Sequence, residues 1–147
     1  MEATLSPTAQ RAGYMVKRLQ QAIRVEMEHR MAGLELGMSG YAALAHLRDA
    51  PGLSSAELAR RCFVTPQTMG GVVALLEERG LLTRVDAEGR AQRLDLTPAG
   101  TEALTSADQV VEAVHEEMLE GFSADEHQLL KRLLTRAIDN IEDATSR

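Results

Sequence analysis

Apolar residues recur at steps of three and four along most of the chain, and this period predicts helices. A first long helix is expected from a Ser6-Pro7 cap to about Met31, because Ser is a favoured N-cap and Pro a favoured first helical residue. Its apolar stripe comprises Ala12, Met15, Val16, Leu19, Ala22, Ile23 and Met27. Residues 33–37, with Gly at both ends, interrupt the pattern, and a second helix is expected over about residues 39–50.

Two short helices are expected next, joined by a tight turn. Pro51-Gly52 is a strong stop signal. Ser54 with Glu57 forms a capping box that opens a helix ending near Cys62. Thr65-Pro66 opens the following helix, which ends at a C-terminal Gly80.

The pattern then changes to that of two strands and two further helices. Strands are expected over residues 81–85 and 92–96, separated by a Gly-containing turn. Thr97-Pro98 starts a helix to about Glu120, and a second capping box, Ser123 with Glu126, starts the last helix. The apolar face of that last helix comprises Leu129, Leu130, Leu133, Leu134, Ala137, Ile138 and Ile141.

This order predicts a mainly α fold with a small β-hairpin wing, that is, a winged helix-turn-helix with additional helices at both ends. A helix-turn-helix places its second helix in the DNA major groove. The long terminal helices each need a partner for their apolar stripes, either one another or a second copy of the chain. A homodimer would also match a palindromic operator in double-stranded DNA.

Composition favours an ordinary soluble protein. Of 147 residues, 44% are apolar and 26% charged. No apolar run approaches the roughly 20 residues that span a bilayer, and the N-terminus lacks a signal-peptide pattern, so a cytoplasmic protein without membrane contact is expected. Cys62 is the single cysteine, which excludes an intrachain disulfide.

The net charge of −6 is unusual for a DNA-binding protein, but the charge is unevenly distributed. Residues 48–93 carry seven Arg and six acidic residues, whereas residues 101–147 carry four basic and eleven acidic residues. This polarity would turn the middle of the chain toward phosphate. The alternative is an acidic, solvated helix face that maintains solubility.

The helix after Thr65 has the features of a recognition helix. Its core face is expected to comprise Met69, Val72, Val73 and Leu76, which leaves Gln67, Gly71, Ala74 and Glu78 on the opposite face. The DNA-binding candidates in its first half are small or polar: Thr65, Gln67, Thr68, Gly70 and Gly71. Gln pairs with adenine through two hydrogen bonds, and a Thr methyl contacts thymine. The two Gly residues allow close backbone approach to DNA, or are merely tolerated there.

Basic residues supply further DNA-binding candidates. Arg90 follows Gly89 at the hairpin tip, where an Arg can enter a narrow minor groove. Arg84 and Arg93 lie on the strands and are expected to hold phosphates. Ser54 and Arg60, at the two ends of the preceding helix, complete the set. The alternative for the tip Arg is simple solvation.

These residues together resemble the MarR family of winged-helix transcriptional regulators. The matching motifs are Pro51-Gly52-Leu53-Ser54 with Glu57-Leu58-Ala59-Arg60, Val64-Thr65-Pro66-Gln67-Thr68-Met69, Leu76-Glu77-Glu78-Arg79-Gly80-Leu81, and Leu94-Asp95-Leu96-Thr97-Pro98-Ala99-Gly100. The resemblance implies one domain over residues 1–147, with a DNA-binding lobe over 38–97 and dimerisation helices over 6–32 and 98–142. It also implies repression relieved by a small anionic aromatic ligand.

Two positions depart from the family pattern. Glu88 stands where an Asp usually braces the wing Arg, and it can still accept that hydrogen bond from a longer side chain. Gly70 stands where relatives often carry a polar or basic residue, so a base contact is expected to be missing. DNA binding would then depend more on Gln67, Thr68 and Arg90, or it would be weaker and depend more on DNA shape.

The effector site has no motif of its own. Arg11 and Arg18 border the first apolar stripe, and Tyr41 and His46 lie on the second helix, so these four are candidates for an aromatic carboxylate. The alternative for the Arg residues is surface or dimer salt bridges.

Other classes of function are less well supported by the residues. The four His residues lack the i, i+4 spacing of a helical metal clamp, so no metal and no cofactor are expected. Cys62 at the turn is expected to be structural, with redox sensing as an alternative, since Arg61 beside it could lower its pKa. A metal-responsive regulator and a winged helix used for protein contacts also stay open. No phosphate loop or nucleophile motif indicates an enzyme.

Overall fold

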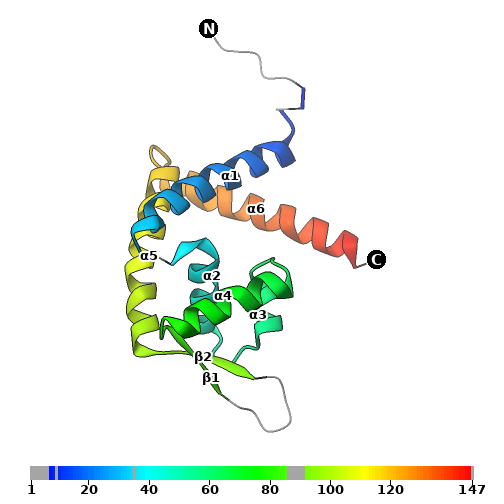
Figure 1. Ribbon diagram of the computed structural model, residues 1–147. Coiled ribbons are helices and arrows are strands. Elements are labelled where there is room, and N and C mark those ends of the chain that lie inside the picture. The colour runs from blue at the N-terminus through cyan, green and yellow to red at the C-terminus, as the bar shows by residue number, and fades with distance from the viewer. Residues whose placement is uncertain (1–6, 9, 35, 86–91, 147) are drawn as a thin grey trace. The chain divides into compact units, whose positions relative to one another are not determined.

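The computed structural model describes residues 7–8, 10–34, 36–85 and 92–146. The described elements are α1 (Ala12–Met31), η1 (Ala32–Leu34), α2 (Gly37–Asp49), α3 (Ser55–Arg61), α4 (Pro66–Glu78), β1 (Leu82–Val85), β2 (Arg93–Leu96), α5 (Pro98–Met118) and α6 (Ala124–Thr145) (Figure 1). The fold is mostly helical with one two-stranded antiparallel hairpin, so the expected fold class is confirmed.

The chain divides into two compact units, residues 1–114 and residues 115–147. The first holds α1 to β2 and most of α5. The second holds the last turn of α5 and all of α6.

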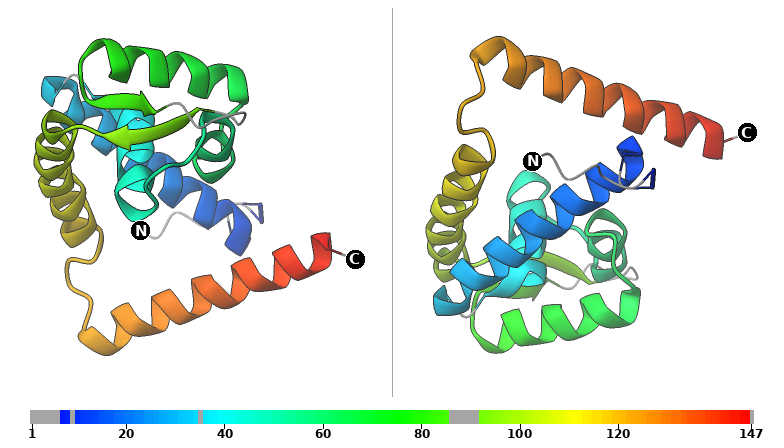
Figure 2. Two further views of the ribbon diagram at one scale, coloured as in Figure 1. Left: turned by 90° about the horizontal axis from the view of Figure 1, so that it is seen from below. Right: turned by 90° about the horizontal axis from the view of Figure 1, so that it is seen from above.

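The core of the first unit lies where the C-terminal end of α1 meets α2, α3, α4, the hairpin and α5 (Figure 2). The side chains at its centre are almost wholly buried and aliphatic: Met31, Leu44, Leu47, Leu58, Met69, Val73, Leu76, Leu82, Leu94 and Leu104. Each comes from a position that the periodic pattern turns inward. Burial of these side chains therefore holds α4 in place from behind.

The hairpin is joined to the loop before α3 as well as to α4. β1 pairs with β2 from Leu82↔Leu96 to Val85↔Arg93. The Gly52 N–H donates to the Leu94 carbonyl at 3.1 Å, and the Leu94 N–H donates to the Leu53 carbonyl at 3.0 Å. These backbone bonds fix the base of the wing relative to α3.

Gly100 permits the closest backbone approach in the described part of the chain. A Cβ at this position would lie 1.9 Å from the Leu81 carbonyl oxygen. The same carbonyl accepts the Thr97 N–H at 3.2 Å, and Thr97 Oγ1 caps α5 by accepting the Gly100 N–H at 3.0 Å. The absence of a side chain at residue 100 thus lets α5 start directly against the end of α4.

The capping signals predicted four helix starts correctly, Thr97 of α5 among them, and one start wrongly. Ser54, Thr65 and Ser123 each cap a helix, with complete capping boxes at Ser54 and Ser123. The expected start of α1 at Pro7 is wrong, because the helix begins at Ala12 and residues 7–8 form a turn. The Arg11 N–H donates to the Thr8 carbonyl at 3.2 Å. Pro suits a turn as well as a helix start.

The apolar stripe of α1 is only partly buried. Met27 is buried, as is Met31 at the C-terminal end of the helix, whereas Met15, Val16 and Leu19 are exposed in the single chain. The second unit shows the same property, since none of the residues of α6 is buried.

Candidate nucleic-acid interface

The helix-turn-helix is formed by α3 and α4, and the cap of α3 is charged. Ser54 Oγ accepts the Glu57 N–H at 3.2 Å, and the Ser54 N–H donates to Glu57 Oε2 at 2.7 Å. These hydrogen bonds, with the nearby Arg residues, lower the pKa of the Glu57 carboxyl. Ser54 therefore has a capping role whether or not it also meets DNA.

The first turn of α4 is held by two threonines. The Thr68 N–H donates to Thr65 Oγ1 at 3.1 Å, and the Thr65 hydroxyl donates to Thr68 Oγ1 at 2.9 Å. Because the Thr65 hydroxyl is the donor in this pair, the Thr68 hydroxyl keeps its own proton for a further acceptor. Both threonines are exposed, and Thr68 is the one whose hydroxyl proton is not used within the pair.

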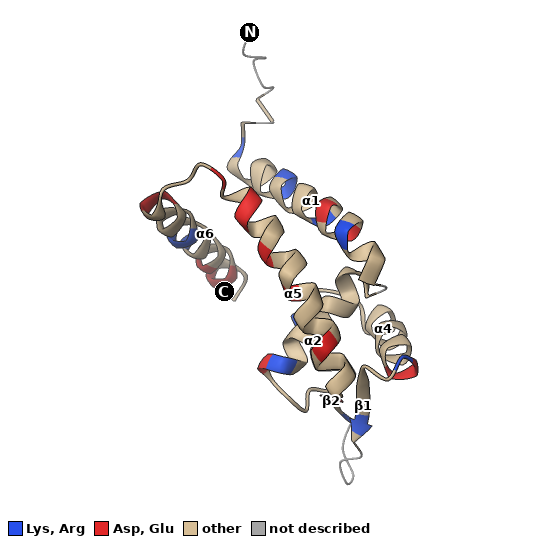
Figure 3. Ribbon diagram, turned by 90° about the vertical axis from the view of Figure 1, so that its left-hand side faces the viewer, with Lys and Arg blue, Asp and Glu red and all other residues tan. Residues whose placement is uncertain are grey.

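The two faces of α4 are separated as the sequence predicted. Met69, Val73 and Leu76 are buried, and Val72 is half-buried. The opposite face, with Gln67, Gly71, Ala74 and Glu78, is exposed along its whole length. The helix carries no Lys or Arg, and Figure 3 shows it uncharged except at its acidic C-terminal end.

Gly70 and Gly71 face open space. A Cβ at either position would meet no atom within 4 Å. Packing within the chain therefore gives no reason for Gly at these two positions, even though each destabilises the helix by about 1 kcal/mol relative to Ala.

The basic candidates lie in different surroundings. Arg84 on β1 donates through Nε to Glu77 Oε2 at 2.9 Å and through Nη1 to Gln92 Oε1 at 3.3 Å. The side chain of Arg93 lies over Gly52, where an added Cβ would be 3.6 Å from Arg93 Cδ. Arg60 is exposed at the end of α3. Arg84 is thus tied to α4 by an ion pair, which the sequence analysis did not foresee.

The wing tip, with Glu88, Gly89 and Arg90, lies outside the described residues. Its expected roles stay predictions from the sequence.

The acidic residues of the C-terminal half recur along α5 and α6, each taken by itself (Figure 3). On α5 one of them has a structural partner. Asp108 accepts hydrogen bonds from Tyr41 and from Arg48, both on α2. Part of the negative charge of α5 is thereby neutralised within the first unit.

The four effector candidates are found in two different settings. Arg18 borders a hollow of about 720 Å³ on α1, lined by Tyr14, Lys17, Arg18, Gln21, Ala22 and Val25. Arg11 is exposed at the N-cap of that helix. On α2, His46 is half-buried, and the hydroxyl proton of Tyr41 is directed to Asp108.

Cys62 is half-buried against the core at the end of α3. Burial raises the pKa of its thiol. The pKa of the thiol is therefore shifted in the direction opposite to the one that the redox hypothesis requires.

Neither a metal site nor a membrane span is found among the described residues. No group of three His, Cys, Asp or Glu residues there could hold a metal ion. Nor does any helix in that part of the chain have the length and apolar character needed to cross a membrane.

Sequence reasoning missed three residues of this region. Asp108 was counted only among the acidic residues of the C-terminal half, Glu77 was named only as part of a motif, and Phe63 was not singled out. Phe63 lies in the turn between α3 and α4 with a positive φ of 55°. A positive φ is normally predicted at a Gly residue, and a bulky Phe gives no such signal in the sequence.

The comparisons with known proteins agree on one family. The family model described as MarR family matches residues 36–93. The HTH-type transcriptional repressor Rv2887 of Mycobacterium tuberculosis is 34% identical over 126 residues, covering 84% of this chain and 91% of the relative.

Two crystal structures of that M. tuberculosis protein are also similar to this chain. Its complex with DNA has a TM-score of 0.75 at 32% identity, covering 86% of this chain and 97% of the other. Its complex with salicylic acid has a TM-score of 0.73 at 33% identity, covering 86% and 96%.

The fold therefore defines a winged helix-turn-helix protein. This chain belongs to the MarR family.

Proposed function

We propose that this protein is a transcriptional repressor that binds double-stranded DNA as a homodimer and is released by a small aromatic acid. The proposal rests chiefly on the two faces of α4. This capped helix is buried along one face and exposed along the other. A helix of this kind in a helix-turn-helix reads base edges with its N-terminal residues. The M. tuberculosis relative, named as a repressor and crystallised with DNA, supports the same role.

The proposed DNA contacts divide by type. Gln67 and Thr68 on α4 would contact bases, with Gly70 and Gly71 allowing the backbone to approach. Ser54, Arg60, Thr65 and Arg93 would meet phosphate, as would Arg84 beside its ion pair. Arg90 is proposed for the minor groove from the sequence alone, with Glu88 as its brace.

DNA binding is tested by selecting duplexes from a random pool with the full chain and measuring affinity across salt concentrations. A palindromic site is expected, with an affinity that falls steeply as salt rises. Gln67→Ala should weaken binding to that site about tenfold, the order of one lost base contact. Gln128→Ala, an exposed Gln on α6, is the matched control. Absence of any selected sequence at low salt would overturn the proposal.

Homodimer formation is proposed from the exposed apolar residues of the long helices. On α6, Leu129, Leu133, Ile138 and Ile141 are exposed, and they belong to a broad apolar stripe that covers about half of the helix surface. Water contact with such a stripe costs about 25 cal/mol per Å² relative to burial, and a second copy of the chain would cover it.

The dimer is tested by sedimentation of two matched variants. Leu133→Lys places a charge in the stripe and should yield monomers. Thr135→Lys places the same charge two residues along, on the opposite side of the helix, and should leave the dimer intact. Equal sedimentation of wild type and Leu133→Lys would contradict a dimer through α6.

Release by an effector is proposed to involve Arg18. The hollow that it borders combines two cations, Lys17 and Arg18, with the ring of Tyr14 and the aliphatic Val25. This composition suits an aromatic carboxylate. The relative crystallised with salicylic acid supports that chemical class. Tyr41 is a poorer donor to a ligand because its proton is directed to Asp108.

Salicylate is the probe for this site. It should raise the melting temperature of the wild type and weaken its DNA binding, and Arg18→Ala should lose both effects. Arg24→Ala is the control, because Arg24 lies on the same helix but is paired with Glu28 at 2.6 Å. A salicylate response that survives in Arg18→Ala would exclude this site.

A further inference from the structure

Phe63 combines two unusual properties in the turn between α3 and α4. It is 96% exposed, the highest value among the exposed large apolar residues of the described chain. Its φ of 55° lies in the left-handed region, where the other described residues with positive φ are all glycines: Gly37, Gly52, Gly80 and Gly121.

The folded chain gains little from this side chain. A bulky residue in the left-handed region costs about 1–2 kcal/mol, which Gly would avoid. The ring gives nothing in return through burial. The turn itself is held by the backbone, since the Phe63 N–H donates to the Arg60 carbonyl at 3.3 Å and the Val64 N–H donates to the Ala59 carbonyl at 3.0 Å. Any residue with a backbone N–H could make those bonds, so the ring is to be explained by a contact outside the chain.

The position of Phe63 indicates which molecule outside the chain its ring would contact. It precedes Thr65, the N-cap of α4, by two residues. In a helix-turn-helix the first helix crosses the DNA backbone and the N-terminus of the second enters the major groove, so the turn between them meets the edge of the groove. The apolar group displayed there is the 5-methyl group of thymine, with which Phe makes a recognised contact.

We propose that Phe63 is a specificity-determining residue whose ring packs on the methyl group of a thymine at the edge of the major groove. This inference rests on the proposed DNA binding. It also accounts for how an α4 without Lys or Arg, and with two Gly residues in its first half, distinguishes sequences, because an apolar contact from the turn adds to the few polar ones.

The experiment crosses a protein change with a DNA change. The protein variants are Phe63→Gly and Phe63→Asn, both compatible with a left-handed φ. The DNA variants replace each thymine of the selected operator half-site in turn by deoxyuridine, which removes only the methyl group. Affinity is measured by fluorescence anisotropy at one salt concentration, with melting temperature as the fold control.

Phe63→Gly should keep or raise the melting temperature and weaken operator binding about tenfold, the order of one base contact. One deoxyuridine per half-site should weaken wild-type binding severalfold but leave the binding of both variants unchanged. That non-additivity assigns the contact to this ring and that methyl. Leu34→Ala, which removes an exposed apolar side chain from η1, should change neither measurement.

Three outcomes would overturn the inference while the proposed repressor function stands. The first is a Phe63→Gly protein that binds the operator as tightly as wild type and represses normally. The second is weaker binding with no deoxyuridine coupling, which would place the ring on deoxyribose instead. The third is wild-type binding with a loss of repression in a reconstituted transcription assay, which would indicate that the ring contacts a protein. If the wild type selects no DNA sequence, the proposed function itself fails.

Discussion

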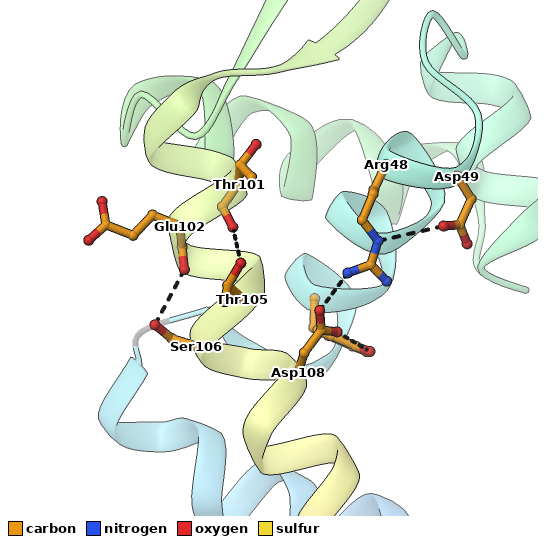
Figure 4. Close-up of polar contacts among 8 residues, drawn as sticks. Arg48, Asp49, Thr101, Glu102, Thr105, Ser106 and Asp108 are labelled. Carbon is orange, nitrogen blue, oxygen red and sulfur yellow. Dashed lines mark hydrogen bonds and ion pairs between the residues drawn. The ribbon is translucent and has the colours of Figure 1, made fainter.

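Arg48 and Asp108 join α2 to α5, with Arg48 Nη1 2.5 Å from Asp108 Oδ2 (Figure 4). The other oxygen of the same carboxylate accepts the Tyr41 hydroxyl at 3.1 Å. α2 packs against α3 and α4, so Asp108 ties the helices behind the helix-turn-helix to α5. Its partners lie 60 and 67 residues away in the chain.

Asp108→Asn should lower the free energy of unfolding by about 1 kcal/mol, because the ion pair is only partly shielded from water. Urea unfolding measures the change. Asp49→Asn is the control, since Asp49 lies 3.6 Å from Arg48 Nε but is 69% exposed. An equal loss from both variants would show that only general surface charge matters.

Alkaline pH should weaken the same contact through Tyr41. Burial, with the hydrogen bond and charge of Asp108, raises the pKa of Tyr41 from 10.0 to about 12. Because the folded state favours the protonated phenol, this contribution to stability is complete below about pH 10 and is lost as pH rises through 12. Tyr41→Phe should therefore show a smaller fall in stability than wild type in that interval. Parallel stability curves for the two proteins would refute this role of Tyr41.

Gly100→Ala should destabilise the protein by about 3 kcal/mol or more, since the new Cβ would overlap the Leu81 carbonyl and force the backbone apart. Thermal unfolding measures the loss. The matched control is Gly71→Ala, where the Cβ meets open space. A Gly100→Ala protein with wild-type stability would mean that α5 does not start against Leu81.

Gly70→Ala and Gly71→Ala should each stabilise the free protein by about 1 kcal/mol, because Ala is the better helix former and neither position is crowded. Both should weaken DNA binding if the backbone of α4 approaches the bases. Opposite signs in thermal unfolding and in operator affinity would identify a functional role for these residues. Raised stability with unchanged affinity would show that the two Gly residues are simply tolerated.

Cys62 should react slowly with thiol reagents at neutral pH, because burial keeps its pKa above the ordinary thiol value. Cys62→Ser should leave operator binding and its response to peroxide unchanged. Rapid alkylation of the folded wild type, or an oxidant response abolished by Cys62→Ser, would restore the redox hypothesis.

The sequence by itself determined the order of the elements, the caps at Ser54, Thr65, Thr97 and Ser123, and the division of α4 into a buried and an exposed face. These features depend on residues within about one helical turn, so the signals lie in short stretches of chain. The start of α1 shows the limit of such signals, since Ser-Pro fits a turn as well as a cap.

Only the tertiary structure decided what Asp108, Arg84, Gly100 and Phe63 do. Asp108 is one acidic residue among many until folding places it beside Tyr41 and Arg48, and Arg84 is a free cation in sequence until β1 places it beside Glu77. The need for Gly at residue 100 arises from the carbonyl of Leu81, and the positive φ of Phe63 from the tight turn between two helices. Each of these roles depends on contacts formed in the folded structure, and a local pattern of residue types does not predict such contacts.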